Sequence, residues 1–278
     1  MKYYRPNTIT DFFELCASLG PGAMTLLAGG TDLMPRYESG KAMPDHLIDL
    51  KMLSELNQIN ISEDEIVIGA LTTIQDIQEN DLIKSEFTAL HTASIDFAGA
   101  QIRHRGTIGG NICNASPAGD LLPSLYLFDA TLFILGPGSE RQLSIQDFIL
   151  GPGKTALEEN EILSSIKLKR TGLHSEFVKV GLRQSMAISV VNVAFLFDSV
   201  LEHLKITAGA VAPTIVHLDS FTDAYLKDTS SLSDVLHLID DDIAPIDDIR
   251  ATASYRKKVL VNLVRHFITS QKLEHENH

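Results

Sequence analysis

Cysteine is scarce in this sequence, and it contains no CxxC pair. Cys16 and Cys113 are the only cysteines among 278 residues. Two thiols cannot hold an iron–sulfur cluster, which usually takes four cysteine ligands. They cannot build a disulfide framework either, and this usage suits a reducing compartment. Acidic residues also outnumber basic ones, which gives a net charge of −13. This charge disfavours a nucleic-acid-binding surface, because such a surface needs clustered Lys and Arg.

Long apolar runs are missing as well. None approaches the ~18 residues of a membrane span, and residues 1–20 lack the apolar core of a signal peptide. Apolar residues nevertheless make up 44% of the chain and charged residues 21%, so a sizeable core is available. We therefore expect an acidic, soluble, cytoplasmic protein whose length suits two domains.

Hydrophobic patterning predicts mixed helices and strands. A helix capped by Thr10 or Asp11 should run to Leu19, and another should open at Thr72 or Thr73. The other expected helices cover residues 82–100 and 121–127, and helices should dominate after residue 212. The expected extended segments are residues 24–28, 47–50, 65–70, 131–135, 162–168, 175–183, 189–199 and 203–212. The polar stretch at residues 170–176 indicates a domain boundary.

Two familiar nucleotide motifs can be set aside. Residues 151–155 (GPGKT) look like the end of a P-loop, but that motif needs glycine where Phe148 stands. Pro152 also removes a backbone donor that a phosphate cradle would use. We therefore expect a surface turn there. The GxGxxG fingerprint of a Rossmann dinucleotide site is absent from the sequence.

The first candidate ligand site is the glycine-rich segment at residues 26–33 (LLAGGTDL). An apolar strand leads directly into Gly29 and Gly30, and a hydroxyl and a carboxylate follow. Glycines let a backbone turn sharply and approach a ligand closely, and successive free N–H groups can bind an anion. A strand followed by two glycines is a common turn, so this segment alone is weak evidence.

A second glycine-rich segment, at residues 106–111 (GTIGGN), again offers small residues, a hydroxyl and backbone donors. His104 lies just before it, between two arginines, and is typical of a surface histidine. Asp120 stands where a helix is expected to open, either as its N-cap or as an acceptor for a ribose hydroxyl. Taken together, the residues indicate a two-loop anion-binding site in an α+β protein.

Seven ordered blocks resemble the FAD-binding medium subunits of the xanthine, carbon monoxide and nicotinate dehydrogenases, the molybdenum hydroxylase family. The resemblance covers nearly the whole chain. The AGGTD and TIGGN loops in this order, with Asp120 nine residues after Asn111, make it highly specific. The blocks are LLAGGTDLMPR, PDHLIDL, EIVIGALTT, FAGAQIRHRGTIGGNICNASPAGDLLPSL, FVKVGLRQSMAISVVNVAF, ITAGAVAPT and DIRATASYRKKVLVNLV.

The resemblance implies an α+β fold. A two-subdomain FAD-binding domain of the vanillyl-alcohol oxidase type would cover residues 1–172, divided into about 1–55 and 56–172. A smaller α+β flavoprotein domain would follow at residues 173–278. The implied noncovalent FAD contacts are Leu26, Leu27, Ala28, Gly29, Gly30, Thr31, Asp32, Leu33, Phe97, Thr107, Ile108, Gly109, Gly110, Asn111, Asp120, Leu163 and Lys179.

Several of these positions have alternative interpretations. Phe97 could contact the isoalloxazine ring or serve as a core aromatic at a helix end. Lys179 could favour electron density on the reduced ring or be a solvated lysine. His104 replaces the asparagine usual in QIRN and should tune the site. The chain lacks the cysteine-rich insertion by which some relatives hold an iron–sulfur cluster.

The resemblance also implies an enzymatic role that is shared between chains. A large partner with molybdopterin would oxidise the substrate, and a small partner with [2Fe–2S] clusters would pass electrons to FAD. NAD or another acceptor would then receive them, so we expect a hetero-oligomer in which this chain supplies no catalytic side chain and no metal ligand. The alternatives are a free-standing flavin-dependent oxidase and a scaffold subunit that has lost FAD.

Overall fold

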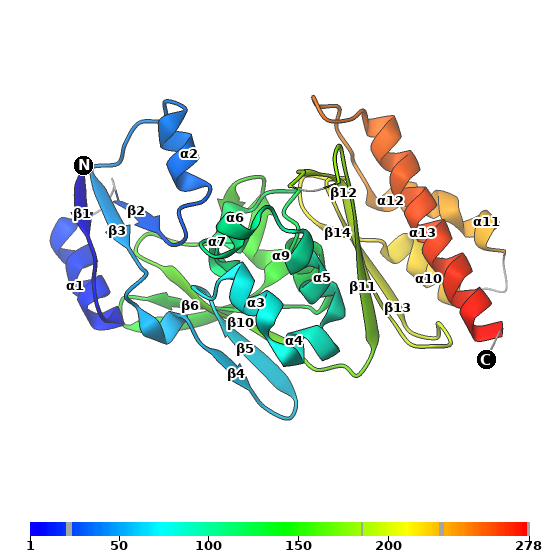
Figure 1. Cartoon of the computed structure of the whole chain (residues 1–278), viewed down its shortest axis with the longest axis horizontal. Helices are drawn as coiled ribbons and strands as arrows, with labels where there is room; N and C mark the ends of the chain where they lie inside the picture. The colour runs from blue at the N-terminus through cyan, green and yellow to red at the C-terminus, as the bar shows by residue number, and fades with distance from the viewer. Residues whose placement is uncertain (21–23, 185, 228–230, 277–278) are drawn as a thin grey trace. The chain divides into compact units, whose positions relative to one another are not determined.

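The computed structural model describes residues 1–20, 24–184, 186–227 and 231–276. The chain divides into two units that alternate along the sequence (Figure 1). Unit 1 consists of Met1–Ile77, Gly99–Asn114 and Asp129–Arg170, and unit 2 consists of Gln78–Ala98, Ala115–Phe128 and Thr171–His278. Two segments from the first half of the chain therefore fold with the C-terminal half.

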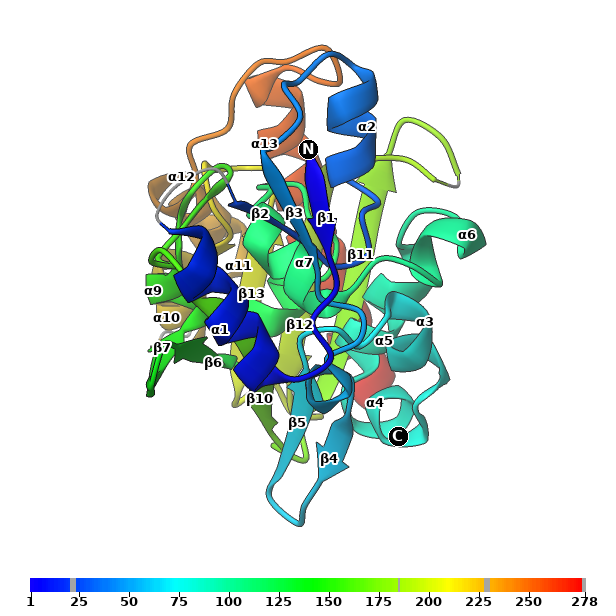
Figure 2. The ribbon, with the colours of Figure 1, turned by 90° about the vertical axis from the view of Figure 1, so that its left-hand side faces the viewer.

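Unit 1 begins with a parallel sheet in the order β1-β3-β2 (Figure 2). Its strands are β1 (Lys2–Tyr4), β2 (Met24–Leu27) and β3 (His46–Asp49). Helix α1 (Ile9–Leu19) packs Phe12 and Cys16 into a core with Ile48. Its N-cap is Thr8, two residues before the first predicted cap, because Thr8 and Asp11 form a reciprocal capping box.

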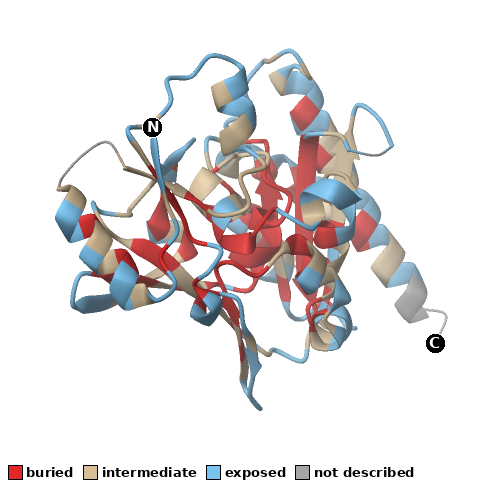
Figure 3. Cartoon of the chain, turned by 60° about the vertical axis from the view of Figure 1, so that its left-hand side comes forward, coloured by how far each residue is buried: buried red, intermediate tan, exposed pale blue. Residues whose placement is uncertain are grey.

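The larger sheet of unit 1 is antiparallel, in the order β4-β5-β10-β6-β7. The strands are β4 (Ile59–Ile61), β5 (Glu65–Gly69), β6 (Thr131–Gly136), β7 (Ser139–Ser144) and β10 (Ile162–Lys169). Strands β5 and β6 bury alternate residues, as expected where one face of a sheet covers a core. Figure 3 shows the buried residues gathered along the strands and on one side of the helices.

The remaining elements of unit 1 are short. They are α2 (Leu33–Glu38), η1 (Ser54–Leu56), α6 (Ala100–Arg103), α7 (Ile108–Asn114), α9 (Ile145–Phe148), β8 (Ile149–Gly151), β9 (Lys154–Thr155) and α3 (Ile74–Glu79), whose last two residues belong to unit 2. Helix α3 opens as predicted, because the hydroxyl of Thr73 accepts a hydrogen bond from the backbone N–H of Asp76. Pro152 and Gly153, within the P-loop-like segment, form the exposed turn between β8 and β9, which confirms the prediction of a surface turn.

Unit 2 is built on the antiparallel sheet β11-β12-β13-β14. The strands are β11 (His174–Gly181), β12 (Ser189–Phe197), β13 (Leu204–Gly209) and β14 (Val216–His217). Every residue of β12 is buried, because helices cover both faces of the sheet. Figure 1 shows α5 on one face and α10 and α13 on the other, and α8 packs against β12 and β13. The sequence of a strand that is buried on both faces is a nearly continuous run of apolar residues.

The helices of unit 2 come from three stretches of the sequence. They are α4 (Asp81–Glu86), α5 (Thr88–Asp96), α8 (Leu122–Leu127), α10 (Asp219–Lys227), α11 (Leu232–Val235), η2 (Leu236–Leu238), α12 (Ile239–Asp242) and α13 (Ala253–Glu276). The prediction of one helix over residues 82–100 is wrong. The chain leaves helical geometry at Phe87, whose φ of −116° and ψ of 51° direct the ring into the core against Phe128.

The long C-terminal helix α13 packs on β12 through a stripe of apolar side chains. Leu260, Val264, Phe267 and Ile268 are buried, and the Phe267 ring stacks on Phe195 with centroids 3.9 Å apart. Tyr255, near the start of the same helix, is 51% exposed and lies outside this stripe. None of the helices that the structure describes is both long enough and apolar enough to cross a membrane.

Candidate functional site

The first glycine-rich segment is the turn between β2 and α2. Gly30 adopts a φ of +75°, which favours glycine because it has no Cβ. Asp32 stands at the N-cap position of α2 but makes no capping hydrogen bond; its carboxylate instead pairs with Arg36 at 2.6 Å. Among the described residues, none accepts a hydrogen bond from the backbone N–H groups of Gly29, Gly30 and Thr31. Successive unpaired donors of this kind can bind an anion.

The second glycine-rich segment leads into α7, and the backbone donors of residues 108–111 are already in use. The N–H of Ile108 donates to Thr72 O, and that of Gly109 donates to Ala70 O. The N–H groups of Gly110 and Asn111 both donate to Thr107, one to the hydroxyl and one to the carbonyl. This segment is therefore a packed helix start, and Oδ1 of Asn111 is its buried acceptor without a partner among the described residues.

Unit 1 brings these two segments side by side. A Cβ on Gly29 would lie 2.0 Å from the carbonyl oxygen of Arg105, so only glycine permits this approach. Arg36 on α2 also donates to Oδ1 of Asn114 at the end of α7, at 2.6 Å. Gly109 is needed for a different contact, because its Cβ would lie 2.6 Å from Ala70. Of the glycines predicted to face a ligand, Gly29 therefore also lets the two segments approach, and Gly109 lets α7 pack on Ala70.

Other predicted positions of unit 1 have plain structural placements. Leu163 lies on β10 at a shift of register and is 6% exposed. His104 ends α6 and is exposed, as expected of a surface histidine. Within the described ranges, no group of three or more His, Cys, Asp or Glu side chains could hold a metal ion.

Unit 2 contains a second cluster of predicted residues, centred on Asp120. The Nζ atom of Lys179 lies 2.6 Å from Oδ2 of Asp120 and 3.0 Å from the carbonyl oxygen of Asp96. Lys179 is thus a buried ion-pair partner with a side chain 8% exposed, which excludes the solvated-lysine alternative. Phe97 follows Asp96 at the end of α5 and is half-buried.

Asp120 is not an N-cap, so that alternative is wrong. Leu121 takes the N-cap position of α8 and the helix has no side-chain cap. The carboxylate is turned into unit 2, where Oδ1 accepts from the Ser189 hydroxyl at 2.6 Å and from Asn192 Nδ2 at 3.4 Å. Burial raises the pKa of the Asp120 carboxyl, while Lys179, Ser189 and Asn192 act in the opposite direction.

Ser189 and Asn192 were missed at the level of sequence. Both are fully buried on β12. The only signal was the interruption of the run SVVNVAFLF by polar residues, since a polar residue inside an apolar strand needs a hydrogen-bond partner. The identity of that partner does not follow from the sequence, because Asp120 lies about seventy residues earlier.

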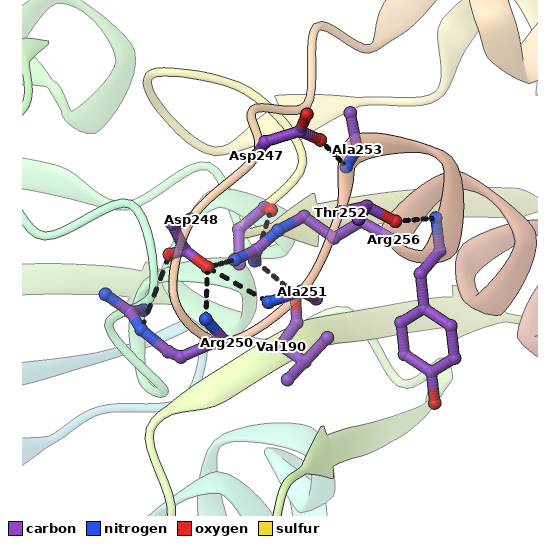
Figure 4. A network of polar contacts seen from close by, with 10 residues as sticks. Val190, Asp247, Asp248, Arg250, Ala251, Thr252, Ala253 and Arg256 are labelled. Carbon is purple, nitrogen blue, oxygen red and sulfur yellow. Dashed lines mark hydrogen bonds and ion pairs between the residues drawn. The ribbon is translucent and has the colours of Figure 1, made fainter.

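Arg256 is a third buried polar residue that was not predicted from the sequence. It is 2% exposed, although it lies on the long C-terminal helix. Figure 4 shows its guanidinium reaching from α13 to Val190 and Asp248. The hydrogen bonds are 2.7 Å to Val190 O, 3.1 Å to Ala210 O and 2.6 Å to Asp248 Oδ1. Arg256 therefore fixes the start of β12 from the face opposite Asp120.

Comparison with known proteins identifies both parts of the chain. Residues 1–169 match the family model of the FAD binding domain in molybdopterin dehydrogenase. Residues 176–271 match the CO dehydrogenase flavoprotein C-terminal domain.

Individual relatives match over nearly their whole length. The xanthine dehydrogenase FAD-binding subunit of Escherichia coli O157:H7 is 30% identical over 278 residues, covering 96% of this chain and 94% of that protein. The carbon monoxide dehydrogenase medium chain of Hydrogenophaga pseudoflava is 30% identical over 272 residues, covering 95% of this chain and 94% of that protein. A chain in a solved structure of carbon monoxide dehydrogenase from Hydrogenophaga pseudoflava matches with a TM-score of 0.87 and 27% identity, covering 96% and 95%.

Proposed function

The chain belongs to the family of FAD-binding medium subunits of the molybdenum hydroxylases, and we propose that it acts as the electron-transfer subunit of such a complex. It carries the FAD-binding domain of that family followed by the flavoprotein C-terminal domain. The observation that carries the proposal is the turn at Gly29, Gly30 and Thr31, whose N–H groups have no acceptor among the described residues. Three neighbouring donors at a glycine turn fit a pyrophosphate.

We assign the pyrophosphate to the first glycine-rich segment, residues 26–33. Its unpaired backbone donors would bind the phosphate oxygens, and the absence of a side chain on Gly30 would let the backbone approach them. Residues 107–111 would contribute differently, because the N–H groups of residues 108–111 already donate to Ala70, Thr72 and Thr107. They would present the bare face of Gly110, which is exposed, and the unpartnered Oδ1 of Asn111.

The remaining assigned residues would contact other parts of FAD. In unit 2, Phe97 would contact the ring system, Asp120 the sugar region and Lys179 the ring. In unit 1, Leu163 would add an apolar contact. The buried pair of Lys179 and Asp120 supports the assignment in unit 2, since ion pairs in low-dielectric surroundings are common at functional sites. The chain's own residues would bind and orient FAD, and the bound cofactor would supply the redox chemistry.

We further propose two partner chains. A large subunit with molybdopterin would take two electrons from the substrate, and a small subunit with [2Fe–2S] clusters would pass them on singly. NAD or another two-electron acceptor would receive the pair, and the complex would work in the cytoplasm. The names of the two relatives, an FAD-binding subunit and a medium chain, support a multi-subunit assembly.

The domain division near residue 172 is part of the same proposal. The FAD-binding domain would cover residues 1–172, with subdomains of about 1–55 and 56–172, and the C-terminal domain would cover 173–278. The family-model matches support this division, since one ends at residue 169 and the next begins at residue 176. Residues 78–98 and 115–128 nevertheless pack within unit 2, so the inherited domains and the packed units need not coincide.

FAD titration of the purified chain tests the proposal. We expect the chain to be yellow and to release one FAD per chain on denaturation. Gly110→Asp should weaken FAD binding by at least an order of magnitude, because a carboxylate would repel the pyrophosphate. Asn60→Asp adds the same charge on exposed β4 of the same unit and should leave FAD affinity unchanged. A wild-type chain that binds no FAD, or equal affinity in both variants, would contradict the assignment.

Copurification separates this role from the two alternatives. A medium subunit should be recovered with an iron–sulfur chain and a molybdopterin chain. A free-standing oxidase would instead reduce oxygen with a substrate in the absence of any partner. A scaffold without FAD would assemble with the partners but remain colourless.

A further inference from the structure

The carboxylate of Asp120 is held from both sides within unit 2. Oδ2 accepts from Lys179, and Oδ1 accepts from Ser189 at 2.6 Å and Asn192 at 3.4 Å. The side chains of Asp120 and Lys179 are only 10% and 8% exposed. A buried charge is costly unless it is paired and hydrogen-bonded, so these donors determine how stable the ionised carboxylate is.

Strand register explains why these particular residues meet. Lys179 on β11 pairs with Asn192 on β12, which pairs in turn with Gly209 on β13, so the three residues share one face of the sheet. A Cβ on Gly209 would lie 2.2 Å from Oδ1 of Asn192, and the glycine therefore makes room for the amide. The amide nitrogen must face Asp120 and the carbonyl of Gly119, because both are acceptors.

A shift of register brings Ser189 onto that face. Gly181 pairs with Ser189 while Val180 pairs with Val191, which leaves Val190 as an extra residue on β12. Side chains alternate along a strand, so Ser189 and Asn192 would otherwise point to opposite faces. One inserted residue restores them to the same side, as β-bulges do. The extra carbonyl at Val190 accepts from Arg256.

Lys179 is fixed through this arrangement. Two of its three N–H donors are used, one by Asp120 and one by the carbonyl of Asp96. In the part of the chain that the structure describes, no third acceptor binds Nζ, which leaves one charged donor for a ligand.

We propose that Ser189 and Asn192 are positioning residues of the flavin site, which hold the Asp120 carboxylate so that it fixes and neutralises Lys179. The inference rests on the proposed function, since it assumes that Lys179 contacts FAD. Neither residue needs to touch the cofactor. Their effect reaches it through the net charge of the Lys179–Asp120 pair. A weaker hold on Asp120 leaves more net positive charge beside the cofactor, and reduction adds negative charge to that cofactor.

The midpoint potential of bound FAD tests the proposal. In the FAD-loaded full chain, Ser189→Ala should move the potential to a more positive value, and Asn192→Leu should move it in the same direction. The matched control is Ser175→Ala, which removes a buried hydroxyl of the same sheet that bonds to the backbone N–H of Ala89 and does not contact Asp120. This control should retain the wild-type potential.

A double-mutant cycle distinguishes positioning from general loosening of the structure. In an Asp120→Asn background the charge has been removed, so Ser189→Ala should no longer shift the potential. An equal shift in both backgrounds, or no shift from either Ser189→Ala or Asn192→Leu, would overturn the inference while leaving FAD binding intact. Failure of the wild-type chain to bind FAD would overturn the proposed function together with this inference. Circular dichroism confirms that each variant is folded, and Asn192→Leu replaces Ser189→Ala if the latter is not.

Discussion

The carbonyl oxygen of Val190 accepts a 2.7 Å hydrogen bond from Nη1 of Arg256, at the one residue by which β12 exceeds the facing part of β11. An extra residue in a strand leaves backbone groups without ladder partners, and a buried carbonyl without a partner is costly. The guanidinium of Arg256 thus supplies a donor to the carbonyl that the bulge leaves unpaired. The same bulge places Ser189 beside Asp120. The charge of Arg256 is balanced by Asp248, which is also held by the N–H groups of Arg250 and Ala251 (Figure 4).

Arg256→Met should therefore destabilise unit 2 strongly. The substitution keeps most of the side-chain volume but leaves Val190 O, Ala210 O and Asp248 without their donor. Removing one partner from a buried charged network costs on the order of 3 kcal/mol, which urea unfolding would measure. Arg265→Met, at an exposed position of the same helix, is the control and should change the free energy of unfolding by less than about 0.5 kcal/mol. Similar losses in both variants would show that the buried contacts are not responsible.

Two adjacent glycines on α7 should respond differently to alanine. A Cβ on Gly109 would lie 2.6 Å from both the Cβ and the carbonyl oxygen of Ala70, whereas one on Gly110 would meet only the Thr107 hydroxyl at 2.9 Å. Gly109→Ala should cost about 1–3 kcal/mol through overpacking. Gly110→Ala should cost at least about 1 kcal/mol less, because alanine favours the helix. Thermal unfolding of both variants without FAD checks this, and equal stabilities would contradict the packing role of Gly109.

The buried pair of Lys179 and Asp120 predicts non-additive stability changes. Lys179→Met leaves the Asp120 carboxylate buried without its counter-charge and should cost on the order of 3 kcal/mol. Adding Asp120→Asn to that variant should restore part of the loss, because the uncompensated charge has gone. Urea unfolding of the wild type, the two single variants and the double variant measures the coupling. Strictly additive losses would mean that the ion pair does not contribute.

The free energy of unfolding should depend on pH through the ionisation of Glu161. Arg141 holds this carboxylate with two hydrogen bonds, of 2.7 and 2.6 Å, and the backbone N–H of Glu158 adds a third. Hydrogen bonding to Arg141 lowers the pKa of Glu161 against the opposing effect of burial. A lowered folded-state pKa stabilises the protein above the unfolded pKa of about 4.3. That stability is lost as the pH falls through the folded-state pKa.

Glu161→Gln should therefore be less stable than the wild type at neutral pH, by roughly 1–2 kcal/mol given that Arg141 is partly exposed to solvent. The gap should close as the pH falls through the lowered folded-state pKa of Glu161, where the wild-type carboxylate becomes protonated. Glu140→Gln, on exposed β7, provides the control and should show no gap at either pH. If the difference in stability between Glu161→Gln and the wild type did not change with pH, it would not arise from the charge of Glu161.

Much of the secondary structure and the position of the glycine segments followed from local sequence. The strand before Gly29, the helix opened by Thr73 and the exposed turn at Pro152 depend on neighbours within a few residues, and chain periodicity and turn chemistry record those directly. The family could also be predicted from the sequence, because the segments typical of the family occur in order along nearly the whole chain.

Tertiary structure decided which donors and charges are used. The backbone donors of Ile108 and Gly109 looked as available as those of residues 29–31, but the carbonyl oxygens of Thr72 and Ala70 accept their hydrogen bonds. A capping role for Asp120 was reasonable locally, yet its carboxylate turns to Lys179 and β12. The break at Phe87 likewise follows from burial of its ring against Phe128. Each outcome depends on residues tens of positions away, where the free energy of burying a polar group or a ring outweighs local preference.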